Sequence, residues 1–137
     1  MRVLVTGGAG FIGSNFVHYA LENTTHEIVT VDALTYAGSR SNLDGTLESD
    51  RHRFVEGDIR NRDLINELVS EVDAVVNFAA ESHVDRSIDS AEPFVSTNVQ
   101  GTQTLLDAAR SHDIERFLQI STDEVYGEVL DGTFSES

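Results

Sequence analysis

Two acidic side chains stand next to each other in the stretch STDEVYG, residues 121–127. Asp123 and Glu124 follow an apolar run over residues 117–120 that is typical of a buried strand, so the pair is expected in the turn where this strand ends. Two carboxylates can act as general acid and general base when their surroundings separate their pKa values, and removal of water from adjacent carbons requires both roles. The alternative is an acidic pair on a solvated loop or at a helix cap.

A glycine-rich stretch, TGGAGFIG at residues 6–13, lies near the start of the chain. It fits two spacings, Gly8-x-Gly10-x-x-Gly13 and Gly7-x-x-Gly10-x-x-Gly13. Either spacing allows a tight turn between strand and helix, close approach of backbone to a pyrophosphate, and packing of the helix on the strand. The free amides of the helix start can bind phosphate without a lysine. The alternative is an ordinary strand–helix turn.

An acid follows this turn at the distance expected for a dinucleotide site. Asp32 lies 19 residues after Gly13, at the end of a second apolar run, where a carboxylate binds ribose hydroxyls. Ala33 follows it, so a 2′-phosphate would meet a negative charge and no adjacent base. This pattern predicts NAD rather than NADP as the cofactor, with Arg40 in the following loop as a possible counterexample.

Alternating strands and helices would position these groups. Apolar runs predict strands over residues 2–6, 27–32, 53–56, 73–78 and 117–121, and helical spacing predicts helices over 11–22, 61–70 and 91–111. Residues 34–50 are polar and irregular, with room for one short helix. Such alternation is typical of an α/β, Rossmann-like, doubly wound parallel sheet of about five strands in the order 3-2-1-4-5. Ligands of such sheets bind beyond the carboxyl ends of the strands.

Composition excludes several classes of protein. The 137 residues fit one domain and carry a net charge of −15, which argues against binding to nucleic acid and suggests a high-salt cytoplasm. No apolar run is long enough to span a membrane. There is no cysteine, and the five histidines show no metal-ligand spacing, so no metal site is predicted. All nine basic residues are arginines.

Four motifs together carry a family resemblance. The glycine turn resembles the opening of the extended short-chain dehydrogenases/reductases that act on nucleotide sugars, which use the Gly7, Gly10, Gly13 register. With DALTYAG (residues 32–38), FAAESHVDRS (78–87) and STDEVYG (121–127), the chain resembles the dTDP-glucose 4,6-dehydratases over its whole length. One departure is Ala33, where dehydratases often carry lysine.

The resemblance implies roles for individual residues. Glu124 would be the base that takes the proton from carbon 5 of the sugar, Asp123 the acid that protonates the departing 6-hydroxyl, and Thr122 a hydrogen-bond partner of the 4-hydroxyl. Ser82 and Thr122 would contact the sugar, and His83 could also do so. The implied NAD contacts are Gly7, Gly10, Phe11, Ile12 and Gly13 at the pyrophosphate, Asp32, Ala33, Leu34 and Thr35 at the ribose, Asp58 and Ile59 at the adenine, and Phe78, Ala79, Ala80, Glu81, Ser82 and Thr97 toward the nicotinamide.

The family oxidises the 4-hydroxyl with a Tyr-x-x-x-Lys pair, and this sequence has no lysine. Residues 1–137 are therefore interpreted as the incomplete NAD-binding domain of a longer dehydratase, without the substrate region, able to bind NAD but inactive alone. Two alternatives stay open: part of a related epimerase or decarboxylase, or a non-catalytic NAD-binding module. The expected partner is a nucleotide sugar. We also expect a homo-oligomer or a self-associating fragment, because the fifth strand would have an open edge.

Overall fold

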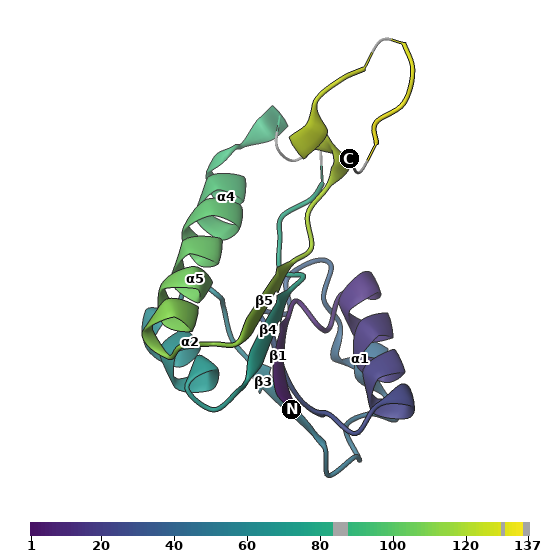
Figure 1. The fold of residues 1–137 in the computed structure, drawn as a ribbon, viewed down its shortest axis with the longest axis vertical. Coiled ribbons are helices and arrows are strands. Elements are labelled where there is room, and N and C mark those ends of the chain that lie inside the picture. The colour runs from purple at the N-terminus through teal and green to yellow at the C-terminus, as the bar shows by residue number, and fades with distance from the viewer. Residues whose placement is uncertain (84–87, 130, 136–137) are drawn as a thin grey trace.

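The computed structural model describes residues 1–83, 88–129 and 131–135, with only the backbone described at Asp123 and Glu124. It confirms the predicted sheet: five parallel strands in the order β3-β2-β1-β4-β5 (Figure 1). The strands are β1 (Arg2–Thr6), β2 (Glu27–Asp32), β3 (His52–Glu56), β4 (Ala74–Asn77) and β5 (Arg116–Gln119). Each lies within two residues of its predicted start and end.

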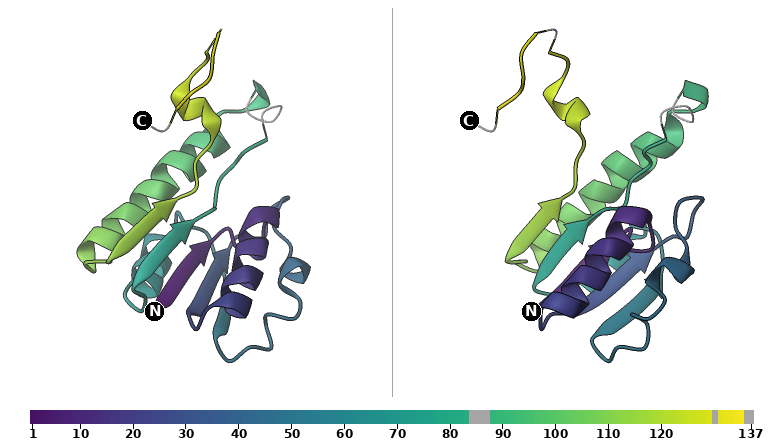
Figure 2. Two further views of the ribbon diagram at one scale, coloured as in Figure 1. Left: turned by 45° about the vertical axis from the view of Figure 1, so that its right-hand side comes forward. Right: turned by 90° about the vertical axis from the view of Figure 1, so that its right-hand side faces the viewer.

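Helices cover both faces of the sheet. The helix α1 (Phe11–Asn23) lies on one face, and α2 (Arg62–Val69) and α5 (Thr102–Ser111) lie together on the other (Figures 1 and 2). The core accordingly has two clusters, one centred on Val17 and Ile28 under α1 and the other on Ile65 and Leu105 under α2 and α5. None of the described helices is long and apolar enough to cross a membrane.

The predicted long helix over residues 91–111 has three parts. It begins as α4 (Glu92–Phe94), continues as a π-helical segment η2 (Val95–Gly101) and ends as α5. Gly101 lets this helix approach the loop after β3, since a Cβ there would lie 2.5 Å from the Cδ1 atom of Ile59. Periodicity predicted the length of the helix but not the change of helical type within it.

The run 117–120 has the composition of a buried strand, but the structure places it at the edge of the sheet, as the predicted order 3-2-1-4-5 implies. In the described chain β5 is an edge strand that pairs only with β4, and Leu118 is 52% exposed. Beyond β5 a 3₁₀ helix, η3 (Asp123–Tyr126), projects from the body of the domain (Figure 1). The apolar pattern of β5 is that of an inner strand, but its pairing in this chain is that of an edge.

Candidate functional site

The glycine turn joins β1 to α1 at the carboxyl edge of the sheet. Gly7 has a left-handed backbone (φ +66°), and a Cβ on it would lie 2.6 Å from the amide nitrogen of Ala79, where the chain leaves β4. A Cβ on Gly13 would overlap the carbonyl oxygen of Gly7, so this glycine packs on the turn itself rather than on the strand. These two constraints match the Gly7-x-x-Gly10-x-x-Gly13 spacing.

The first turn of α1 is open to a ligand. Gly10 is the N-cap residue and provides no side-chain cap, and the first amides of a helix have no partner within the helix. Phe11, the first residue of α1, is 81% exposed, and Ile12 beside it is also exposed. Amide groups and apolar surface therefore face outward together at the helix end that attracts anions.

Asp32 links the end of β2 to the glycine turn. Its Oδ2 accepts a hydrogen bond from the Ala9 amide at 2.9 Å, and its Oδ1 accepts one from the Leu34 amide at 2.8 Å. The residue is only 9% exposed. A carboxylate oxygen has two lone pairs, so each oxygen can accept a further bond from a ribose hydroxyl.

The loop after β2 presents the other residues predicted at the ribose. Ala33 and Thr35 are exposed, and Leu34 is half-buried with a left-handed backbone (φ 49°). The loop is held to the glycine turn at Ala9, whose carbonyl oxygen accepts hydrogen bonds from the Ser39 amide (3.0 Å) and the Asn42 side chain (2.8 Å). The position of Arg40, which the sequence left open, is over the Phe54 ring, 5.3 Å from its centroid.

The turn after β4 runs beside the glycine turn. Phe78 packs its ring on Phe16 of α1, so its side chain belongs to the core and only its backbone borders the site. Ala80 and Ser82 are exposed. Asn98 of η2 fixes the backbone of Glu81 through two hydrogen bonds, accepting from its amide at 2.8 Å and donating to its carbonyl at 2.9 Å.

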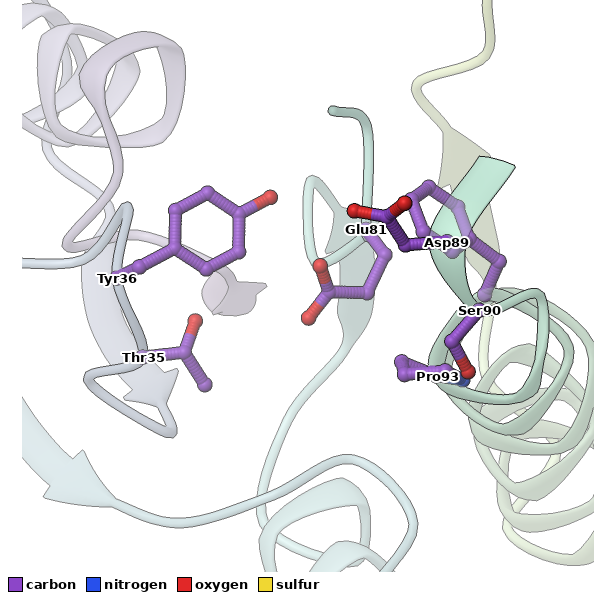
Figure 3. A pocket seen from close by; sticks show the side chains of 7 residues that line it. Thr35, Tyr36, Glu81, Asp89, Ser90 and Pro93 are labelled. Atoms are coloured by element: carbon purple, nitrogen blue, oxygen red, sulfur yellow. The ribbon is translucent and has the colours of Figure 1, made fainter. Parts of the chain in front are cut away.

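An open cavity of about 460 Å³ lies between the loops that follow β2 and β4. Figure 3 shows Thr35 and Tyr36 on one side, Asp89, Ser90 and Pro93 on the other, and Glu81 between them. The Tyr36 ring also meets His83 edge to face, with ring centroids 5.4 Å apart. Two of the predicted cofactor residues, Thr35 and Glu81, therefore line the cavity.

The loop after β3 carries the residues predicted at the adenine. Arg60 donates to both carboxylate oxygens of Asp58 (2.5–3.0 Å) and to the Ser96 hydroxyl (2.9 Å). The hydrogen bonds from Arg60 lower the pKa of Asp58, which favours its charged, accepting form. The Ile59 side chain is buried in the core, so only its backbone could meet a ligand, and Thr97 is half-buried.

The predicted acid–base pair follows β5, apart from these loops. Thr122 is exposed, and its carbonyl accepts from the Val125 amide at 3.5 Å as η3 begins. The side chains of Asp123 and Glu124, and residues 84–87 of the FAAESHVDRS stretch, lie outside the described structure. Within the described part, no group of three or more His, Cys, Asp or Glu side chains could hold a metal ion.

Sequence reasoning missed several polar residues that organise this edge. They are Thr6, Asn77 and Gln119 at the ends of three neighbouring strands, Arg60 in the loop after β3, and Asn98 in η2. A signal was present: Asn77 and Gln119 interrupt runs that are otherwise apolar. This signal is easily overlooked, because strands are predicted from their apolar residues and a single polar residue does not change the prediction.

Comparison with known proteins places the chain. The family described as GDP-mannose 4,6 dehydratase matches residues 4–137. The "Low-salt glycan biosynthesis protein Agl12" of Haloferax volcanii is 73% identical over 99% of this chain and 44% of its own length. A dTDP-glucose 4,6-dehydratase of Mycobacterium tuberculosis is 57% identical over 94% of this chain and 38% of its own length. The chain thus spans about two fifths of these relatives.

Solved structures share the fold. The dTDP-glucose 4,6-dehydratase DesIV of Streptomyces venezuelae, with NAD and TYD bound, is 52% identical with a TM-score of 0.94, over all of this chain and 44% of that one. A UDP-glucose-4-epimerase of Stenotrophomonas maltophila with bound NAD is 32% identical with a TM-score of 0.89, over all of this chain and 41% of that one. The fold is thus common to both enzyme types, whereas sequence identity is higher to the dehydratase.

Proposed function

Because the chain belongs to the GDP-mannose 4,6 dehydratase family, we propose that residues 1–137 form the NAD-binding domain of a nucleotide-sugar 4,6-dehydratase that acts on dTDP-glucose. The observation that carries the proposal is the direct bond between Asp32 and the glycine turn, through the Ala9 amide. It joins a pyrophosphate-binding turn and a ribose-binding acid into one unit. Identity of 57% and 52% to dTDP-glucose dehydratases supports this substrate over the GDP-mannose of the family description.

The residues at the carboxyl edge fit NAD. A Cβ on Gly7 or Gly13 would collide with the backbone of Ala79 or of Gly7, so the tight turn requires glycine at both positions, and the uncapped start of α1 suits a pyrophosphate. Asp32 would hold the ribose hydroxyls, and Asp58, held by Arg60, would accept from the adenine amino group. The turn from Ala79 to Ser82, in which Ala80 and Ser82 are exposed, would lead toward the nicotinamide. When bound, NAD supplies a reversible hydride acceptor.

Two features favour NAD over NADP. The 2′-phosphate of NADP would lie beside the Asp32 carboxylate, and the two neighbouring negative charges would repel each other. The nearest basic candidate, Arg40, instead contacts the Phe54 ring.

The acid pair would carry out the elimination. Glu124 would take the proton from carbon 5 and Asp123 would protonate the departing 6-hydroxyl, while Thr122 would hold the oxygen on carbon 4. A carboxylate is a strong enough base for the carbon 5 hydrogen only when carbon 4 is a carbonyl. Removing the 4-hydroxyl proton is, by family resemblance, the work of a Tyr-x-x-x-Lys pair, and these 137 residues contain no lysine.

Calorimetric titration in molar salt tests the cofactor proposal. We expect the chain to bind NAD more tightly than NADP. The Asp32→Ala variant should bind NAD more weakly, and its affinities for NAD and NADP should differ less. Asp50→Ala is the matched control, because Asp50 is an exposed acid outside the site and its loss should change neither affinity. Equal affinity for NAD and NADP in the unmodified chain would contradict the role of Asp32.

A further inference from the structure

Three polar side chains form a row across the neighbouring strands β1, β4 and β5. Thr6 of β1 is the register partner of Asn77 of β4, and Asn77 is the register partner of Gln119 of β5. Thr6 and Asn77 are both fully buried, in strands that are otherwise apolar. A buried amide is costly unless its hydrogen bonds are made, so this row needs a physical account.

The hydrogen bonds of the row have a fixed direction. The Ala79 amide donates to the Thr6 hydroxyl (3.3 Å) and to the Asn77 Oδ1 (3.2 Å), and a backbone N–H can only donate. The Asn77 amide therefore cannot be flipped, and the Thr6 hydroxyl donates to the same Oδ1. Asn77 Nδ2 then donates to Gln119 Oε1 at 2.8 Å, and Gln119 Nε2 donates to the Ile120 carbonyl at 3.0 Å.

Each member of the row stands where a strand meets a turn of the site. Thr6 precedes Gly7 of the glycine turn, Asn77 precedes the turn that contains Ala79, and Gln119 precedes the segment that carries the acid pair. A change in the orientation of one amide would leave buried partners unsatisfied in the next strand. The row is thus a continuous polar connection between turns that are distant in sequence.

We propose that Asn77 is a positioning residue that holds the glycine turn, the turn after β4 and the segment 120–126 in one mutual arrangement. Ordering of the first two turns by the cofactor thereby orders the segment that carries Asp123 and Glu124. The link to the cofactor rests on the proposed function. The mutual arrangement itself does not, because it follows from contacts within the ligand-free chain.

Hydrogen exchange of the purified chain, followed by mass spectrometry in molar salt, tests the proposal. Gln119→Met removes the acceptor of Asn77 Nδ2 at an exposed position while keeping the length of the side chain. Without added NAD, we expect this variant to raise the exchange rate of the Ala79 amide about fivefold. This is the change expected when one net hydrogen bond is lost. Gln119→Glu keeps an acceptor and should restore most of the protection at Ala79. Leu118→Met, the neighbouring exposed position, should leave Ala79 unchanged.

NAD provides the second comparison. In the unmodified chain we expect NAD to slow exchange over residues 7–13 and also over 120–126, and in Gln119→Met to slow it over 7–13 alone. Slowing over 7–13 without any effect on 120–126 in the unmodified chain would overturn the coupling and leave the proposed function intact. No slowing in either segment would count against the proposed function, and the ligand-free comparison would then decide the role of Asn77. Unchanged exchange at Ala79 in Gln119→Met would refute that role.

Discussion

The loops that follow β1, β2, β3 and β4 differ sharply from the segment that follows β5. The first group is bound together by short contacts, such as Ala9 with Asp32 and Glu81 with Asn98. The segment after β5 exposes Leu118 on an edge strand and Val125 and Tyr126 beyond it. The loops predicted to bind the cofactor are thus joined to one another directly, whereas the segment with the predicted acid–base pair is attached to them mainly through β5 and the polar row. Five experiments test this contrast.

The largest expected effect is that the chain binds NAD but catalyses no dehydration of the sugar nucleotide. Given NAD and dTDP-glucose in molar salt, the purified 137-residue chain should form no 4-keto product. The reason is that Glu124, as the proposed base, would have no acidified carbon 5 hydrogen to remove until carbon 4 is oxidised, and the chain has no lysine for the family's oxidising pair. Sustained product formation that disappears in Glu124→Gln would overturn this contrast between the two regions.

The second experiment tests how tightly the cofactor loops are joined. Gly7→Ala should abolish NAD binding and lower the free energy of unfolding by roughly 2–4 kcal/mol, because it combines a left-handed backbone with a Cβ 2.6 Å from the Ala79 nitrogen. Gly45→Ala is the matched control: Gly45 has the same backbone hand (φ +83°) but open space around it. Urea unfolding should show that Gly45→Ala lowers the free energy of unfolding by only about 1 kcal/mol. Equal losses would show that the close approach to β4 is unimportant.

Self-association between copies of the chain is expected at the open edge of β5 but not at α1. The open edge of β5 and the exposed Leu118 invite pairing between copies, so light scattering should show self-association that grows with concentration. Leu118→Glu should reduce it by placing charge on that edge, while Tyr19→Glu, an equally exposed position on α1, should not. A monomer at all concentrations would contradict the expectation.

Salt should stabilise the whole chain and the C-terminal part most. The net charge is −15, with 13 acids and 6 arginines in residues 1–83 but 11 acids and 3 arginines in the shorter stretch 84–137. Screening of this repulsion should raise the melting temperature steeply toward molar salt. Hydrogen exchange should slow more with salt in residues 88–129 than in 1–83. A melting temperature that does not change with salt would be the contrary result.

The smallest effect concerns β3, at the opposite edge from β5. Burial, with His18 nearby, lowers the pKa of the His52 imidazole, whose Nε2 lies 2.9 Å from the Thr30 hydroxyl. The unfolded chain therefore binds this proton more readily, so the stabilisation is present above about pH 6.5 and is lost as pH falls below it. The slope should stay under the one-proton limit of about 1.4 kcal/mol per pH unit, because the ring is only half-buried. His52→Gln should flatten the pH dependence of urea unfolding, and an unchanged pH dependence in this variant would contradict the expectation.

Much of this arrangement was predictable from local patterns. Apolar runs and helical spacing predicted every strand and the order of the sheet, because a buried parallel strand needs an unbroken apolar run. The glycine turn and Asp32 were predictable because backbone conformation and ribose recognition require particular residue types at a set spacing. The edge position of β5 followed from the predicted strand order, but its apolar run alone would not show it, because such a run looks the same in an inner strand and at an edge.

The amino-acid sequence by itself determined the α/β alternation, the glycine turn with its acid, the acidic surface and the absence of lysine. These depend on residue type and short-range spacing, which are present before the chain folds. Only the tertiary structure decided that Asp32 bonds to Ala9, that Arg40 lies over Phe54 and that Asn77 joins Thr6 to Gln119. Such contacts join residues that are 14 to 71 positions apart, and which of them meet is decided by the packing of the whole sheet.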